Sequence, residues 1–196
     1  MSRGCELRRI SQEDSQLFVR FPEKLLALEQ ARHEAYKHKD YAEEVADPTR
    51  QFYDWHVLTA LVSGSAAWTL LFKSGQQVGT TEQMWQVLDA DARILSVGQV
   101  QALNESLKEL LTEEDEQALI DLAMAELASK PLLTPSTAPT EEWTLSDTGP
   151  EEHWPQWHNP GPSQAEIDLT LYRMLQQLQQ FMQVAVEAKN ALMILA

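Results

Sequence analysis

The sequence predicts an α+β fold: a small mixed sheet with N- and C-terminal strands, packed by several helices that include a long C-terminal helix. Strand-like segments lie near both ends of the chain, and segments with the three- and four-residue spacing of amphipathic helices lie between them. The length of 196 residues, of which 43% are hydrophobic, suits one domain over residues 1–196.

The first elements follow from short local signals. Residues 5–10 (CELRRI) predict a strand, and Ser11 is an N-cap residue whose side chain would accept a hydrogen bond from a backbone N–H of the next helix. Pro22 begins a second helix, because proline suits the first helical turn, and the charged segment 37–40 ends it. The Asp-Pro pair at 47–48 predicts a turn.

Two apolar segments follow this turn. The stretch QFYDWHVLTALVSG predicts a helix that contains Phe52 and Trp55 and that Gly64 can close in the left-handed conformation. Residues 66–75 (AAWTLLFKSG) favour a strand and a turn, with a helix as the open alternative, because short apolar runs do not distinguish the two.

The middle of the chain is the most regular. Residues 92–95 (ARIL) predict a strand, and Ser96 with Gln99 forms the capping box of the next helix. That helix has an apolar stripe of Val100, Leu103, Leu107, Leu110 and Leu111. Thr112 opens another helix whose first turn is acidic, and carboxylates there complement the positive end of the helix dipole.

The C-terminal part predicts a long helix and a final strand. QAEIDLTLYRMLQQLQQFMQVAVEAK repeats apolar residues at helical spacing, with Gln and Glu on the opposite side. NALMILA is apolar enough to lie in the centre of a sheet.

Four stretches together resemble one known family. LRRISQEDSQLF, DWHVLTALVSG, ARILSVGQVQALNESL and FMQVAVEAKNALMILA are similar to the YfbM-like family, a bacterial domain of unknown function. WPQW, residues 154–157, resembles a Tyr-Pro and Trp motif that precedes the last long helix of that family. The resemblance implies a mixed α+β domain with no established activity, so it assigns no catalytic residue.

The charge is unevenly distributed along the chain. Residues 1–50 hold nine Lys/Arg and ten Asp/Glu, whereas residues 51–196 hold six and twenty, so nearly all of the net charge of −15 belongs to the second part. An acidic surface repels phosphate groups, which makes nucleic acid and anionic membranes poor partners. A basic protein is the complementary partner, and solubility alone is the open alternative.

Residues 131–163 form a Pro/Trp-rich irregular insert that holds seven of the nine prolines. Within it, EEHWPQWHNPGP suggests either a packed or partner-facing loop or a metal site. His153, His158 and Glu152 have the right chemistry for a metal-dependent hydrolase. The two histidines are separated by four residues on a Pro-broken loop without a fixed third ligand, so the loop is the favoured interpretation.

The sequence also predicts the compartment. It contains no run of about 18 apolar residues and no secretory signal at its start, and its single cysteine, Cys5, excludes an internal disulfide. We therefore expect a soluble, cytoplasmic protein.

These observations predict a non-enzymatic acidic binding protein. We expect an immunity or inhibitor protein that occludes the basic active site of a cognate bacterial toxin, without a cofactor or a bound metal. The alternatives are a small metal-dependent hydrolase of unknown substrate and a housekeeping protein. The predicted partner-binding residues are Glu113, Glu114, Asp115, Glu116, Glu141, Glu142, Glu151, Glu152, Trp154 and Trp157.

Overall fold

The structure is a computed structural model that describes residues 4–36, 47–129 and 162–196. The chain divides into two compact units. The first combines Met1–Glu113 with Leu171–Ala196, and the second spans Glu114–Thr170. The first unit contains the sheet and both clusters of buried hydrophobic residues, so the fold is described mainly from this unit.

The described residues form one five-stranded sheet, in the order β2-β1-β5-β4-β3. The strands are β1 (Gly4–Ile10), β2 (Arg50–Asp54), β3 (Gln76–Gln77), β4 (Ala92–Leu95) and β5 (Ala191–Leu195). The N-terminal strand β1 pairs with the C-terminal strand β5, which confirms the predicted placement of the two terminal strands. Every ladder is antiparallel, whereas we expected a mixed sheet. Strand direction depends on which strands become neighbours, and that is not visible in a strand's own residues.

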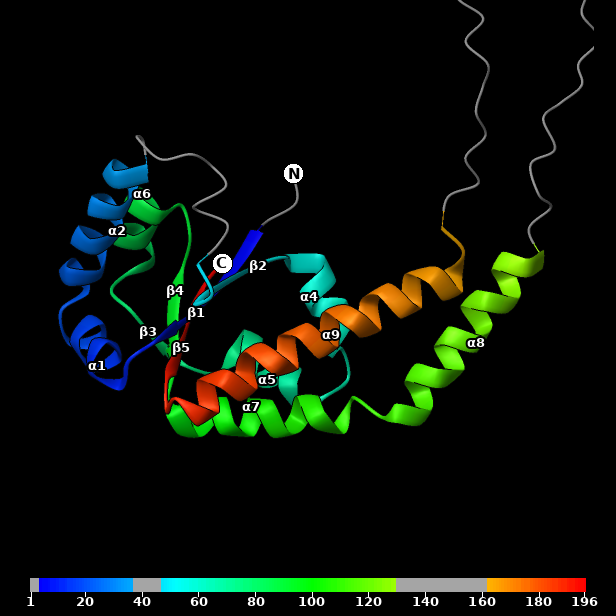
Figure 1. The fold of residues 1–196 in the computed structure, drawn as a ribbon. Coiled ribbons are helices and arrows are strands. Elements are labelled where there is room, and N and C mark those ends of the chain that lie inside the picture. The colour runs from blue at the N-terminus through cyan, green and yellow to red at the C-terminus, as the bar shows by residue number, and fades with distance from the viewer. Residues whose placement is uncertain (1–3, 37–46, 130–161) are drawn as a thin grey trace, which may run out of the picture. The chain divides into compact units, whose positions relative to one another are not determined.

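Helices lie on both sides of this sheet (Figure 1). One side carries α1 (Gln12–Arg20), α2 (Pro22–Tyr36) and α6 (Thr81–Leu88). The other side carries α4 (Trp55–Val62), α5 (Ala66–Lys73), α7 (Val97–Glu109) and the part of α9 (Gln164–Glu187) that belongs to the first unit. The remaining helix is α8 (Glu113–Ser129). The predicted α+β class and long C-terminal helix are confirmed.

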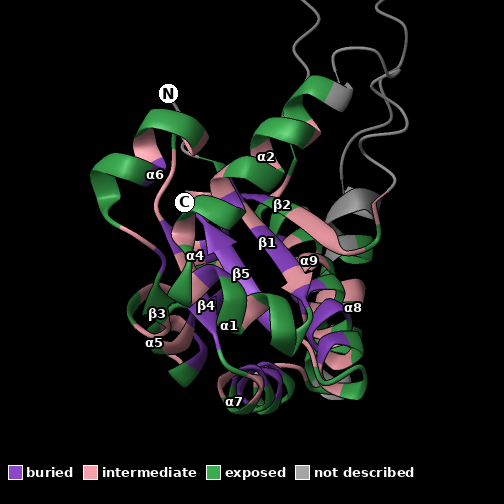
Figure 2. Cartoon of the chain, turned by 90° about the vertical axis from the view of Figure 1, so that its left-hand side faces the viewer, coloured by how far each residue is buried: buried purple, intermediate pink, exposed green. Residues whose placement is uncertain are grey.

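The strand β5 explains the position of the core. All five of its residues are buried, and Figure 2 shows it in the middle of the sheet. Leu192 and Ile194 join the cluster under α4, α5, α7 and α9, whereas Met193 joins the cluster under α1, α2 and α6. A strand covered on both faces needs a continuous apolar sequence, which the segment ALMIL supplies.

The predicted helix starts are confirmed by their caps. The Ser11 hydroxyl accepts from the backbone N–H of Asp14 at 2.9 Å at the start of α1. At the start of α7, Ser96 and Gln99 form the capping box, with the Ser96 N–H donating to the Gln99 side chain at 2.9 Å. Gly64, two residues after the end of α4, adopts a φ of 76°, in the left-handed conformation expected there.

Two predictions in the region 51–75 are wrong. Residues 66–73 form the helix α5, which was the open alternative, rather than the favoured strand, because Ala67 and Leu71, four residues apart, are both buried on one side of it. The QFYD segment forms most of strand β2, and the helix begins only after Asp54, whose carboxylate accepts from two backbone N–H groups of α4. Phe52 consequently lies on the edge strand, where 61% of it is exposed.

Candidate functional site

The predicted acidic turn opens a helix, as expected. The helix α8 begins at Glu113; Asp115 is exposed and Glu116 is half-buried. The side chains of Glu113 and Glu114 lie outside the described part of the chain. The apolar Leu122 and Met124 of this helix are 56% and 61% exposed. The helix therefore presents both carboxylates and apolar side chains to the solvent among its described residues.

The other predicted contact residues lie outside the described residues. They are Glu141, Glu142, Glu151, Glu152, Trp154 and Trp157. His153 and His158 of the alternative metal site lie outside them as well. The roles of all eight stay predictions.

Among residues 4–36, 47–129 and 162–196, no three His, Cys, Asp or Glu side chains gather in a way that could hold a metal ion. Cys5 is buried in the sheet, and burial raises the pKa of its thiol to about 12, against a weaker lowering effect of the charge on Arg93. A thiol with such a pKa stays protonated at neutral pH and is a poor nucleophile.

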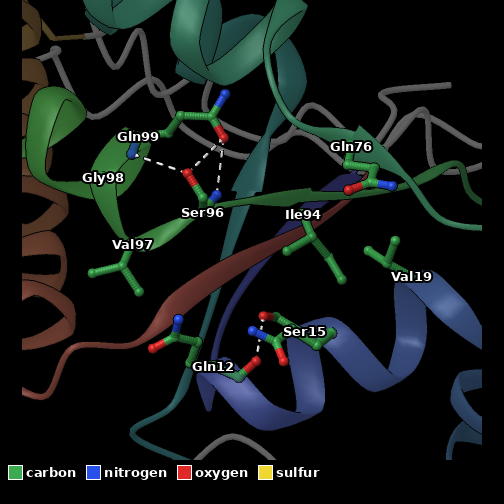
Figure 3. A pocket seen from close by; sticks show the side chains of 10 residues that line it. Gln12, Ser15, Val19, Gln76, Ile94, Ser96, Val97, Gly98 and Gln99 are labelled. Atoms are coloured by element: carbon green, nitrogen blue, oxygen red, sulfur yellow. Dashed lines mark hydrogen bonds between the residues drawn. The ribbon is translucent and has the colours of Figure 1, made fainter.

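A groove of about 460 Å³ lies between α1, the start of α7 and the strands β3 and β4 (Figure 3). The side chains of Gln12 and Ser15 lie on one side of it and those of Ser96 and Gln99 on the other, with Ile94 between them. Its described lining is Gln12, Ser15, Gln16, Val19, Gln76, Ile94, Ser96, Val97, Gly98 and Gln99. None of these side chains is titratable.

The hydroxyl groups in this groove already donate hydrogen bonds within the protein. Ser96 donates to the Gln99 side chain at 3.1 Å, and Ser15 donates to the backbone oxygen of Gln12 at 2.7 Å (Figure 3). An activated serine needs a neighbouring base, and the described lining contains neither a His nor a carboxylate. The groove can hydrogen-bond neutral polar groups, but its described residues supply no acid, base or activated nucleophile.

A partly buried network of charges lies on the sheet face that α2 covers. Arg8 is 2% exposed and forms two hydrogen bonds with the Glu29 carboxylate, at 2.5 and 3.1 Å. Glu6 accepts from Arg8 at 2.9 Å and from Arg50 on the neighbouring strand at 2.7 Å. Arg32 extends the network at 3.3 Å from Glu29. Charges of opposite sign therefore alternate from β2 through β1 to α2.

The network stays charged although it is buried. Burial opposes the charged form of Glu6, but the hydrogen bond from Arg50 and the charge of Arg8 outweigh burial and lower the pKa of the Glu6 carboxyl. Burial likewise opposes the charged form of Arg8, and the hydrogen bond to Glu29 with the charge of Glu6 raises its pKa. These ion pairs connect α2 to the sheet, which is a structural role.

A smaller pocket of about 220 Å³ lies on the opposite face of the sheet. It is lined by Trp55, Phe72, Asp91, Arg93 and Ala196. The two aromatic rings meet edge to face, with centroids 4.5 Å apart. The backbones of Asp91 and Ala196 are joined by hydrogen bonds of 2.8 and 3.0 Å. The Oδ1 atom of Asp91 is buried and has no hydrogen-bond partner among the described residues.

Sequence reasoning missed both the ion network and this pocket. Glu6 and Arg8 are two residues apart on a predicted strand, which places them on one face, but their partners come from β2 and α2. The pocket combines the starts of α4 and β4 with the end of α5. The two-residue spacing of Glu6 and Arg8 was the only sign of the ion network in the sequence, and it identified neither Arg50 nor Glu29 as a partner.

No helix in the described part of the chain is long and apolar enough to cross a membrane. No protein-family model, curated protein or solved structure matches the chain. The resemblance to the YfbM-like family therefore stays a prediction.

Proposed function

We propose that this protein is a non-enzymatic binding protein of the cytoplasm that recognises a basic protein partner. The form of this function that we favour is an immunity protein, which occludes the basic active site of a cognate bacterial toxin. Carboxylates of the protein meet Lys and Arg side chains in the partner's cleft, and apolar side chains beside them exclude water.

The charge distribution carries this proposal. Residues 51–196 hold twenty Asp/Glu against six Lys/Arg. In the described part of the chain, several of the arginines of the protein are also occupied internally. Arg8 and Arg50 bind half-buried carboxylates, and Arg93 donates to the carbonyl groups of Leu71 in α5 and of Ser74, the residue that follows α5. A field of this sign attracts a basic protein and raises its association rate.

The first turn of α8 supplies a specific contact for such a partner. Asp115 is exposed and Glu116 is half-buried, and the exposed Leu122 lies seven residues after Asp115, on the same side of the helix. An interface commonly surrounds an apolar centre with a polar rim, and these side chains offer both components.

The experiment immobilises the full chain and captures proteins from a lysate of its source cells at low and high salt, with mass spectrometry of the captured proteins. We expect a basic protein that is lost at high salt, since salt screens exposed charges. The purified partner is then titrated against the double variant Asp115→Lys, Glu116→Lys. We expect this variant to bind at least about tenfold more weakly, because like charges across an interface cost several kcal/mol.

The matched control reverses two other exposed carboxylates, in Glu82→Lys, Glu109→Lys, and changes the net charge equally. Equal weakening in both variants would assign the effect to the overall field and remove α8 from the interface. Recovery of no basic partner at low salt would refute the proposed function.

A further inference from the structure

We propose that the pocket formed by Trp55, Phe72 and Asp91 receives one basic side chain, a lysine or an arginine, of the partner protein. This inference rests on the proposed function, since it gives the basic partner a specific point of entry. The pocket lies in the first unit, on the sheet face covered by α4 and α5, and it shares no residue with α8.

The chemistry of the lining fits a cation. Aromatic rings attract an ammonium or guanidinium group over their faces, and tryptophan does so most strongly. Trp55 and Phe72 are both half-buried and both line the pocket. Asp91 adds a carboxylate whose Oδ1 atom is buried without a described donor. A desolvated carboxylate oxygen without a hydrogen bond is costly, so an incoming cation that neutralises this group is favoured.

The size of the pocket selects a single side chain. Sites for drug-sized molecules measure about 300–1,000 Å³. This pocket holds about 220 Å³, which is below that range. Side chains that dominate protein interfaces insert in this way into small pockets near the centre of the contact.

Arg93 is the one described cation in the lining, and its contacts reduce its competition for Asp91. Its two terminal nitrogens donate to Leu71 O at 3.0 Å and to Ser74 O at 3.1 Å. Among the described residues, it forms no ion pair with Asp91 within 4.0 Å. Burial lowers the pKa of Arg93, which indicates that its charge is incompletely compensated, and the charge of Asp91 acts in the opposite direction. Arg93 therefore does not neutralise the charge of Asp91 through a direct ion pair, and that charge attracts another cation to the pocket.

The test titrates the ¹⁵N-labelled full chain with Nα-acetyl-lysine amide and Nα-acetyl-arginine amide, observed by NMR. The chain has six tryptophans, and the Trp55→Phe variant assigns the indole N–H signal of Trp55. Nα-acetyl-norleucine amide is the control ligand, since it has an alkyl side chain without the charge. We expect the Trp55 indole signal to shift with the basic ligands and not with the norleucine ligand.

Asp91→Asn is the decisive variant, and Asp89→Asn is its matched control. Asp89 is exposed, lies two residues away and has a φ of 52°, which asparagine tolerates. Both variants lose one negative charge. We expect D91N to bind the lysine ligand about tenfold more weakly, since the neutral amide loses the charge-assisted interaction with the ammonium group. D89N should bind as the unchanged protein does. Asp91→Ser is a second neutral variant in case D91N unfolds.

The outcomes separate this site from the proposed function. Equal affinities of D91N and D89N, or an equal response to the norleucine ligand, would overturn the site even when a basic partner is captured from the lysate. Weaker capture of that partner by D91N than by D89N would support the site. Binding of the small ligands without any basic protein partner would overturn the inference, because the pocket would then take a free small cation.

Discussion

The two faces of the sheet are stabilised in different ways. On the face covered by α4, α5, α7 and α9, the buried cluster consists of aliphatic and aromatic side chains. On the face covered by α1, α2 and α6, the apolar cluster is smaller, and the ion network of Glu6, Arg8 and Glu29 lies beside it. Leu7 and Arg8 are consecutive on β1 and are 0% and 2% exposed, so adjacent residues on one strand contribute to the two kinds of packing.

This difference separates two kinds of constraint. The free energy gained by burying apolar side chains is proportional to the buried area. An apolar core therefore tolerates a substitution that changes the shape of a side chain but keeps its volume. A buried ion pair tolerates little, because its partners must compensate for their lost hydration through specific geometry. The apolar face should therefore accept conservative substitutions that the face with the ion network rejects.

The largest expected effect comes from Arg8→Met. Loss of this buried side chain leaves the half-buried carboxylates of Glu6 and Glu29 with one partner fewer, and removal of one member of a buried pair costs about 3–5 kcal/mol. Urea denaturation followed by circular dichroism measures the change. The second substitution Glu29→Gln should recover part of the loss, since it removes one uncompensated charge. Arg32→Met, at the more exposed end of the network, is the control, and equal losses in the two arginine variants would contradict the prediction.

A core cavity is expected to cost slightly less. Leu192→Ala, on the apolar face of β5, should destabilise by about 2–5 kcal/mol, because the removed methyl groups leave a cavity that closes only partly. Leu192→Met keeps the volume and should cost less than about 1.5 kcal/mol. The same denaturation experiment on Leu122→Ala, at an exposed position, should show a change within about 0.5 kcal/mol. A loss from Leu192→Met as large as that from Leu192→Ala would refute the assumed tolerance of this face.

The smallest expected effect is a pH dependence of the ion network. The pKa of Glu6 is lowered in the folded protein from its ordinary value of 4.5. Its contribution to stability is therefore fully present above the unfolded-state pKa and is lost as the pH falls through the folded pKa. Unfolding free energies measured between neutral and acidic pH should show this loss. The variant Glu6→Gln should lack this part of the pH dependence, and an unchanged slope would exclude Glu6 as its source.

Local signals predicted much of the fold. Ser11, Ser96 and Gln99 identified helix starts because caps use residues only a few positions apart. The segment 191–195 identified the central strand because its signal, an unbroken run of apolar residues, is also contained in neighbouring positions. The pattern was ambiguous at 66–73, where four-residue burial outweighed the strand-like composition, and at Phe52, where pairing with β1 extended a segment predicted as a helix.

A candidate site could be predicted from the sequence only where all of its residues come from one segment of the chain. The acidic start of α8 was visible because its residues are consecutive. The pocket of Trp55, Phe72 and Asp91 was not, since its three side chains come from separate segments that the fold brings together. Residues that lie far apart in the sequence form a site only when the tertiary structure brings them together, so no short stretch of sequence indicates such a site.

The central position of β5 also bears on how the sheet is assembled during synthesis. In the described sheet, β5 joins the pair of β1 and β2 to the pair of β3 and β4, and it lies almost one hundred positions after β4 in the chain. Until the ribosome has released residues 191–195, β1 and β4 each keep an unpaired edge, and such edges are sites of aggregation. The sheet therefore stays incomplete in the nascent chain until this strand has emerged.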